Sequence, residues 1–395
     1  MTIGPVGTHP FDSIELASLR NRHGNKFALW KEPVIPAWVA DMDFPVAAPI
    51  SAVVAQAVAK SDWCYPPETL RQAFAEAGCE WMRRRHGLDA DAGLSVLLND
   101  VVQGVHLAVM ALTDRRDDVI VHTPSYPPFL ETIDELDRGF LDNAMVLGGH
   151  GFEFDMNLLR TQARTAKLLI LCNPQNPTGR VMTRTELTTV AEIVVENNLV
   201  VIADEIWADL VAPGQQHIAF ASISAEIAER TVTLISPSKP FNMAGLRAAL
   251  MIFGGATLKD RVMGVIPSHL LGTINTAGLL AGISAYTECD EWLADTNEYL
   301  DINRRYVAQR FALEVPGVRH IPGQGTYVAW FDCAALPIDG DARHWFVKHA
   351  LVGLSEGKNF GAKHRTSTRL NFATSRPILA EILDRMCRAV ETTRN

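Results

Sequence analysis

Polar clusters follow four short apolar runs in the middle of the chain, and they contain residues that could do chemistry. Their principal members are Tyr126, Asn176, Asp204 and Lys239. A lysine beside a buried strand can bond covalently to a carbonyl compound, and an aspartate that closes such a strand can pair with a pyridinium nitrogen. Each cluster alone is more simply explained as a turn, since turns favour Asn, Asp, Pro and Ser. Because all four clusters converge on one edge of the sheet, a catalytic role is favoured over four unrelated turns.

Hydroxyl and guanidinium donors stand close to Lys239 in the sequence. Ser236, Ser238 and Arg247 could bind a phosphate group. The segment 103–105 opens an apolar helix whose N-terminal amides would form an anion site, and its glycine would let the backbone approach the anion closely. A carbonyl-binding lysine, a pyridinium-pairing acid and a phosphate site together indicate pyridoxal 5′-phosphate (PLP) as a cofactor.

The elements that must position these residues can be predicted from the hydrophobic pattern. The runs that precede the clusters are apolar on both faces, which is typical of strands buried in a parallel sheet; they span 119–123, 168–173, 199–204 and 232–236. Between them, 183–198 has a helical pattern that begins with a capping box, Thr183 and Glu186. This alternation predicts an α/β fold with a mainly parallel sheet. The carboxyl ends of its strands would meet at one edge.

Composition excludes several classes of protein. The chain has 395 residues, of which 48% are hydrophobic and 21% charged, so it can form a large core and is neither disordered nor fibrous. With 36 Lys and Arg against 45 Asp and Glu, its net charge is −9, which makes nucleic acid and anionic membranes poor partners. The N-terminus lacks a signal-peptide pattern, and no apolar run reaches the length of a membrane span.

The cysteines and histidines predict neither a disulfide framework nor a metal site. Six cysteines are scattered along the chain without a C-x-x-C motif, and the twelve histidines form no H-x-x-x-H pair. We therefore expect no bound metal and mostly buried, reduced thiols, as in a cytoplasmic protein.

Several motifs also carry a family resemblance. CNPQNPTGR, DEIW and SPSK, with an arginine eight residues after the lysine, resemble fold-type I (aspartate aminotransferase-like) PLP enzymes over essentially the whole chain. WVADMDFP, SPSKPFNMAGL and GKNFG…RLNFAT are similar to the MalY/PatB-type branch of cystathionine β-lyases, which are C–S lyases. The resemblance implies a mainly parallel seven-stranded sheet in a large cofactor domain (46–285). A smaller α+β C-terminal domain (286–395) would follow, and the N-terminal segment (1–45) would pack with it.

The resemblance also implies roles for the residues around the cofactor ring. Lys239 would bond to the cofactor aldehyde and shuttle the Cα proton. Asp204 would keep the ring nitrogen protonated, and Asn176 would form a hydrogen bond with the ring hydroxyl. Tyr126 would stack on the face of the ring. Arg369 would bind the substrate carboxylate through its planar, two-pronged guanidinium.

A further set of residues is expected at the cofactor phosphate. By the same resemblance, the phosphate would be bound by Gly104, Val105, Ser236, Ser238 and Arg247. Tyr65, in the sequence WCYPP, would reach the phosphate of a neighbouring subunit. The resemblance therefore implies a homodimer.

The implied activity is a carbon–sulfur β-lyase that releases a thiol from cystathionine or another S-substituted L-cysteine and forms pyruvate and ammonia. The alternative is a PLP-dependent aminotransferase that passes an amino group to a 2-oxo acid. The sequence leaves both reactions open because both begin with removal of the Cα proton.

Two residues depart from the family pattern. Trp207 replaces a usual Tyr or His and offers only an N–H donor, and Pro240 follows the lysine where Thr is common. Both hint at a specialised substrate.

Other motifs have weaker support. Gly353 to Gly357 matches G-x-S-x-G, but a helical pattern precedes it where a hydrolase needs a strand. Ser236 to Lys239 matches S-x-x-K, yet S-D-N and K-T-G are missing from the sequence. G-x-G-x-x-G is also missing, which disfavours a dinucleotide-binding dehydrogenase. A non-catalytic regulatory role stays possible on sequence grounds, although the full set of cofactor residues disfavours it.

Overall fold

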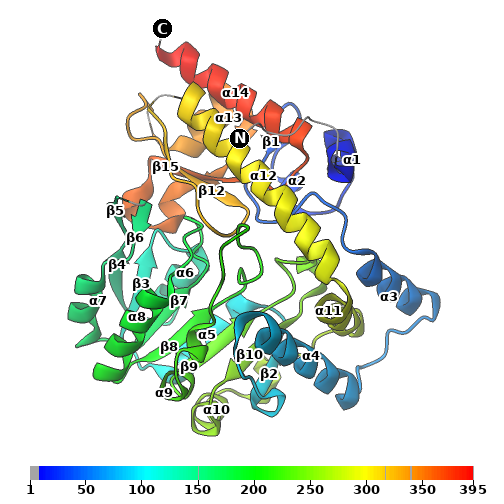
Figure 1. The fold of residues 1–395 in the computed structure, drawn as a ribbon, viewed down its shortest axis with the longest axis vertical. Helices are drawn as coiled ribbons and strands as arrows, with labels where there is room; N and C mark the ends of the chain where they lie inside the picture. Colours follow the sequence, from blue (N-terminus) through cyan, green and yellow to red (C-terminus); the bar gives the residue numbers. More distant parts are fainter. Residues whose placement is uncertain (1–8, 150, 316, 339, 395) are drawn as a thin grey trace.

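A seven-stranded sheet occupies the lower half of the molecule in Figure 1. The computed structural model describes residues 9–149, 151–315, 317–338 and 340–394. The strands are β2 (Ser95–Leu98), β3 (Asp118–Thr123), β4 (Gly139–Ala144), β7 (Leu168–Cys172), β8 (Val200–Asp204), β9 (Thr231–Ile235) and β10 (Ala249–Phe253). Their order is β2-β10-β9-β8-β7-β3-β4, and β10 alone is antiparallel to its neighbours. The predicted α/β fold with a mainly parallel sheet is confirmed.

Helices cover both faces of this sheet because strand residues alternate between two hydrophobic cores. In β8, Ile202 packs into one core, whereas Val201 and Ala203 pack into the other. The first core includes residues of α5 (Val101–Leu112), and the second includes residues of α8 (Arg184–Glu196). Burial on both faces explains why these strands lack the alternation of apolar and polar residues that a half-exposed strand shows.

Helix α8 begins where its sequence predicts. The Thr183 hydroxyl accepts a hydrogen bond from the Glu186 N–H at 3.2 Å, and the Glu186 carboxylate accepts one from the Thr183 N–H at 2.7 Å. The capping box is therefore confirmed. The other helices around the sheet are α3 (Ala48–Ala59), α4 (Glu68–His86), α6 (Pro127–Glu135), α7 (Met156–Ala163), α9 (Ala225–Ala228), α10 (Ala256–Met263) and α11 (Thr276–Glu288).

A second, four-stranded sheet lies above the first in Figure 1, in the C-terminal part of the chain. Its strands are β11 (Arg319–His320), β12 (Val328–Asp332), β15 (Ser367–Asn371) and β14 (Ser355–Glu356), in that order. Helices α12 (Asp290–Glu314), α13 (Ala342–Ala350) and α14 (Arg376–Arg394) accompany this sheet. The strands place Arg369 in the middle of β15, opposite Trp330 of β12 and Ser355 of β14.

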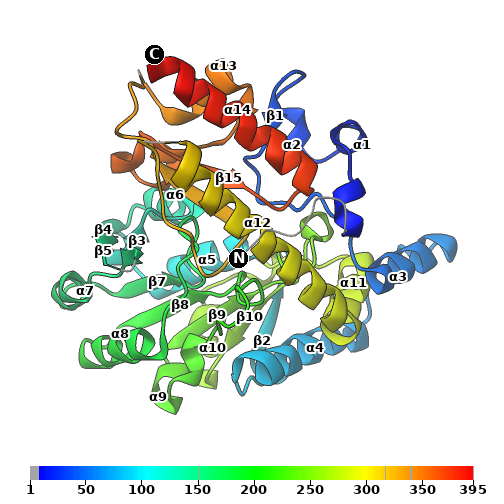
Figure 2. The ribbon, with the colours of Figure 1, turned by 45° about the horizontal axis from the view of Figure 1, so that its top comes forward.

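The N-terminal segment lies beside the C-terminal part of the chain. Its short elements are α1 (Leu16–Arg20), α2 (Asn25–Ala28) and β1 (Ile35–Pro36), and Figures 1 and 2 show them close to α14. Strand β1 pairs in parallel with β13 (Val352–Gly353), and the Ile35 N–H donates to the Leu351 carbonyl at 2.9 Å. The domain limits at 45/46 and 285/286 stay a prediction. Among the described helices, none combines the length and apolar character needed to cross a bilayer.

Candidate active site

A pocket of about 330 Å³ lies at the carboxyl edge of the large sheet, where the predicted residues meet. The strands that carry them run in the same direction, so the segments after β3, β7, β8 and β9 all open onto this edge. Nine of the predicted residues line the pocket: Tyr126, Asn176, Asp204, Trp207, Ser236, Ser238, Lys239, Arg247 and Arg369. Seven come from loops around the large sheet, Asp204 is the last residue of β8, and Arg369 comes from the small sheet, so the pocket lies between the two sheets.

Lys239 is held by the N-terminal segment. Its Nζ donates to the Ala40 carbonyl at 2.7 Å and lies 3.9 Å from the Asp41 Oδ1 atom. The buried Tyr327 hydroxyl donates to the same carbonyl at 2.7 Å. Burial lowers the pKa of Lys239, since removal from water disfavours the ammonium form. A larger fraction of Lys239 is therefore neutral, which a nucleophile or a base requires.

Asp204 is buried without a cationic partner. It ends β8, and its Oδ1 atom accepts a hydrogen bond from the Ile206 N–H at 3.1 Å. Burial raises the pKa of Asp204 to about 7, and Lys239 opposes that shift only weakly. Within the part of the chain that the structure describes, Asp204 forms no ion pair. A protonated pyridine nitrogen would supply the missing positive charge and lower this pKa.

Arg369 and Asn176 form a buried pair on the side of the small sheet. The Arg369 Nη1 atom donates to the Asn176 Oδ1 atom at 2.9 Å, and Nη2 donates to the Trp38 carbonyl at 2.9 Å. The Nε atom is buried and has no hydrogen-bond partner among the described residues. Burial lowers the pKa of Arg369 to about 10. A guanidinium that is buried without a carboxylate among the described residues is suited to bind one from a ligand.

Two aromatic side chains contribute apolar walls to the pocket. Tyr126 follows β3 and is half-buried, and burial raises the pKa of its hydroxyl to about 12, so the phenol stays neutral. Trp207 is buried and packs edge-on against Tyr327, with 4.8 Å between ring centroids. Lys239 Nζ lies 5.9 Å from the centroid of the Trp207 ring. The indole is therefore an inner wall beside the lysine.

The hydroxyl and guanidinium donors predicted for a phosphate all line the pocket. Ser236 Oγ donates to the Ala248 carbonyl at 2.6 Å and lies 2.8 Å from Ser238 Oγ. Arg247 pairs with Asp100 at 2.6 Å, and its side chain is more than half exposed. Asp100 caps α5 by accepting from the Gln103 N–H at 2.7 Å. Hydroxyls, a guanidinium and the first amides of a helix match the donors that a phosphate needs.

The structure differs from the sequence prediction at Gly104 and Val105. Helix α5 begins at Val101, so Val101 and Val102 line the pocket and the predicted pair lies one turn further along. Gly104 faces the sheet, where an added Cβ atom would meet the Leu234 side chain at 2.6 Å, and Val105 is fully buried. The glycine serves close helix–sheet packing, and the helix-start residues that line the pocket are Val101 and Val102.

Tyr65 lies away from this pocket. Its side chain is 96% exposed, and it lines a separate hollow with Trp63 and residues 273–277. The predicted role of Tyr65 requires a second subunit and stays a prediction.

The sequence prediction missed the residues that hold Lys239 in place. Ala40 and Asp41 belong to WVADMDFP, a motif that carries the family resemblance but no predicted chemical role, and Tyr327 directly precedes β12. The rival G-x-S-x-G motif does not present its serine as a nucleophile. Its Ser355 is buried in β14 and donates to the Trp38 carbonyl at 2.9 Å.

Comparison with known proteins places this fold and pocket in a family. The family model for aminotransferase class I and II matches residues 41–386. The chain belongs to this family. The match includes every predicted site residue, from Tyr65 to Arg369. The family contains enzymes of several reaction types, so closer relatives are informative about the reaction.

Three relatives match nearly the full length of this family member. Cystathionine β-lyase PatB of Bacillus subtilis is 30% identical, with 89% of this chain and 91% of the relative covered. Cystathionine β-lyase of Corynebacterium glutamicum is 31% identical, with 94% of this chain and 98% of the relative covered. The solved structure of a PLP-bound C–S lyase from Staphylococcus hominis is 28% identical and superposes with a TM-score of 0.87, covering 98% of this chain and all of that one.

Proposed function

We propose that this chain is a PLP-dependent carbon–sulfur β-lyase. It eliminates a thiol from cystathionine or another S-substituted L-cysteine and produces pyruvate and ammonia. The observation that carries the proposal is the convergence of Lys239, Asp204 and Arg369 on one pocket, in a chain whose near full-length relatives are cystathionine β-lyases.

The residues present fit PLP. When bound, PLP supplies an aldehyde that bonds covalently to amino groups and a protonated ring that withdraws electrons from the substrate. Lys239 would hold the aldehyde carbon, and the buried, uncompensated Asp204 would hold the ring nitrogen. Asn176 would donate its free amide N–H groups to the ring hydroxyl, and Tyr126 would cover a face of the ring.

The phosphate of PLP would lie at the opposite end of the pocket from Arg369. Ser236 and Ser238 would provide hydroxyls and Arg247 its guanidinium, and the first amides of α5 at Val101 and Val102 would complete the set. The pairing of Arg247 with Asp100 holds the guanidinium near that helix start.

The reaction needs two further tasks from the chain. Arg369 binds the substrate carboxylate, which fixes the orientation of the bonds at Cα. The neutral Nζ atom of Lys239 then removes the Cα proton. The Cβ–S bond breaks with its electron pair going to sulfur, and the thiolate takes up a proton. The enamine that leaves is hydrolysed by one water to pyruvate and ammonia.

Product identity tests this proposal. We expect the purified enzyme to release pyruvate and free thiol in equal amounts from L-cystathionine or from S-ethyl-L-cysteine, measured by lactate dehydrogenase coupling and by a thiol reagent. Transfer of the amino group to an added 2-oxo acid, without free thiol, would establish the aminotransferase alternative instead.

Trp207 is proposed to contact the sulfur substituent of the substrate. Its buried indole lines the pocket beside Lys239, so Trp207→His would remove apolar contact area. We expect the ratio of kcat/KM for a bulky S-benzyl substrate to that for S-methyl-L-cysteine to fall about 10- to 200-fold, which corresponds to the range of about 1–3 kcal/mol for a changed apolar contact. The small substrate is the internal control. An unchanged ratio would exclude Trp207 from substrate selection.

We also infer a homodimer that works in the cytoplasm. The exposed Tyr65 and Trp63 line a hollow of about 680 Å³, and exposed large apolar side chains are typical of subunit interfaces. The six cysteines are free, and five are buried, which fits a reducing compartment. Light scattering of the purified protein would test the dimer, since a monomeric mass would contradict it.

A further inference from the structure

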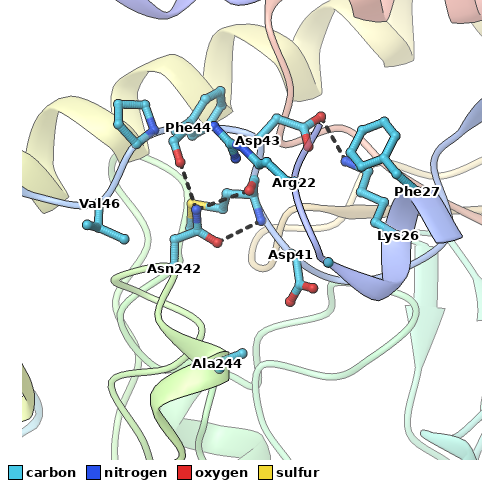
Figure 3. A pocket seen from close by; sticks show the side chains of 13 residues that line it. Arg22, Lys26, Phe27, Asp41, Asp43, Phe44, Val46, Asn242 and Ala244 are labelled. Carbon is cyan, nitrogen blue, oxygen red and sulfur yellow. Dashed lines mark hydrogen bonds and ion pairs between the residues drawn. The ribbon is translucent and has the colours of Figure 1, made fainter. Parts of the chain in front are cut away.

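Buried polar side chains outside the catalytic pocket hold the segments that carry its residues. The N-terminal loop is one such segment: Asn242 accepts from the Met42 N–H at 3.0 Å and donates to the Met42 and Phe44 carbonyls at 3.0 and 2.8 Å (Figure 3). These bonds fix the loop that accepts a hydrogen bond from Lys239. A second set, made of titratable groups, begins at the residue after Asp204.

Glu205, the first residue after β8, forms a buried pair with His217. The Glu205 Oε2 atom lies 3.2 Å from the His217 Nε2 atom, and the exposed fractions of the two side chains are 1% and 0%. The Glu205 Oε1 atom accepts from the Phe220 N–H at 2.8 Å. Neither member of the pair is among the described residues that line the catalytic pocket, so the reaction steps given above do not use them.

His217 also connects the end of β8 to the end of β7. Its Nδ1 atom lies 3.4 Å from the Asn173 Nδ2 atom, while the Asn173 Oδ1 atom accepts from the Met182 N–H at 2.9 Å. Because the bond from Met182 fixes the orientation of the amide, Asn173 presents an N–H group to His217. The imidazole then accepts through Nδ1 and carries its proton on Nε2, toward Glu205. A single tautomer therefore suits both neighbours.

The two strand ends joined by His217 carry the residues that would contact the ring of PLP. Asp204 directly precedes Glu205, and Asn176 follows Asn173 by three positions. The Asn173 N–H also donates to the Asp204 carbonyl at 3.1 Å, so the backbones of the two ends are in contact. One buried histidine thus braces both the acid for the ring nitrogen and the amide for the ring hydroxyl.

The turn after β8 is anchored at its far end as well. Asp209 accepts from His86 Nε2 at 2.8 Å and from Trp81 Nε1 at 3.0 Å, and all three side chains are buried. The His86 ring packs edge-on against the His217 ring, with 5.1 Å between their centroids. The turn that carries Trp207 is therefore held at both ends by one continuous buried cluster.

We propose that Glu205 and His217 are positioning residues, which hold the acid and the amide that contact the PLP ring. The acid is Asp204 and the amide is Asn176. Groups that bind a cofactor must be kept within a fraction of an ångström of their working geometry, and buried polar neighbours do this. The inference rests on the proposed function in one respect, the presence of PLP in the pocket.

The charge of Glu205 also supports this role. A pair of apolar side chains would fill the same space without the cost of desolvating a carboxylate. Burial raises the pKa of Asp204 to about 7, and the neighbouring Glu205 charge adds to this shift. Beside a protonated pyridine nitrogen, however, both carboxylates attract the same positive charge. Glu205 therefore opposes ionisation of Asp204 alone and favours it together with the cofactor.

His217→Leu tests the inference, since it removes both ring nitrogens of the bridge. We expect the dissociation constant of PLP, measured by titrating the cofactor-free chain and following the absorbance of bound cofactor, to rise about tenfold, as for the loss of one hydrogen bond to a charged group. The visible circular dichroism band of bound PLP, which reports how the ring is held, should weaken. His217→Gln keeps an N–H group toward Glu205 and should restore part of both.

His122→Leu is the matched control. His122 is buried like His217 and its Nδ1 atom is bonded to Asn143 at 2.8 Å, but it lies outside the pocket. Its removal costs a buried hydrogen bond and should lower the melting temperature. The dissociation constant of PLP and the visible circular dichroism band should stay at their wild-type values.

The double variant Glu205→Gln, His217→Leu separates positioning from stability. His217→Leu alone leaves a buried carboxylate without its neighbour and should lower the melting temperature, and removal of the charge should restore much of it. The dissociation constant of PLP should nevertheless stay about tenfold above wild type, because neither side chain then bridges β7 and β8. If PLP binding matches wild type in every variant, or recovers together with the melting temperature, the pair is only structural and the inference is wrong. If the wild-type chain binds no PLP, the proposed function itself fails.

Discussion

Lys239→Ala is expected to lower pyruvate release by about a thousandfold or more, since it removes both the covalent anchor of the cofactor and the base at Cα. The far-ultraviolet circular dichroism spectrum should stay unchanged, because, among the described residues, the hydrogen bond and the ion pair of the Lys239 Nζ atom both go to one loop, at the Ala40 carbonyl and the Asp41 carboxylate. Steady-state assays with saturating PLP measure the loss. Lys259→Ala, which removes a partly buried lysine outside the pocket, should retain wild-type activity.

Chemical trapping identifies the lysine independently of activity. Wild-type protein should be yellow, and borohydride reduction should attach the cofactor to a single peptide that contains Lys239. The partly buried Lys259 and the exposed Lys363 are bonded to other partners and lie outside the pocket. A reduced adduct on either of these would show that the active site has been placed wrongly.

Asp204→Asn is expected to cause the second-largest loss. Asparagine has nearly the same shape but no charge to hold a proton on the pyridine nitrogen, so the ring would withdraw electrons less strongly. We expect kcat to fall about a hundredfold or more, which is a loss of about 2.7 kcal/mol or more in transition-state stabilisation. Steady-state kinetics with saturating PLP measure this effect.

A matched control separates this effect from a general change in charge. Asp134→Asn removes an exposed carboxylate from α6 and should leave kcat unchanged. The buried position of Asp204 explains the difference, because burial raises its pKa to about 7 and only a cation at the ring nitrogen would compensate. Turnover by Asp204→Asn within a factor of three of wild type would exclude this role for Asp204.

The sequence predicted the residues that follow strands, and physical reasons explain why. Tyr126, Asn176, Asp204 and Lys239 each come soon after a run that is apolar on both faces, and such runs are strands of a parallel sheet. Since parallel strands end at one edge, the four side chains had to be close together. The structure places all four in the same pocket.

Residues that depend on tertiary contacts could not be predicted in this way. Ala40 and Asp41 reach Lys239 across almost 200 positions of sequence, and no local pattern determines where an N-terminal loop will pack. The sequence prediction starts α5 too late because it assigns Gly104 to anion binding, whereas this glycine allows the helix to pack against Leu234. The N-cap Asp100 was the signal that could have fixed the start at Val101.

Tyr65 shows a different limit of prediction from a single chain. Its side chain is almost fully exposed, so packing within the described part of its own chain gives no sign of a role in binding. A residue that completes the site of another subunit is recognisable only with both subunits present.

The most direct measurement is the number of pyruvate molecules that each active site forms when no 2-oxo acid is present. A β-lyase has no second substrate, so the enzyme should form pyruvate from L-cystathionine continuously, many times per active site, with an equal amount of thiol. An aminotransferase without an acceptor for the amino group would stop after one turnover and would resume only when a 2-oxo acid is added. Continuous release supports the lyase, and a single turnover rescued by a 2-oxo acid would contradict it.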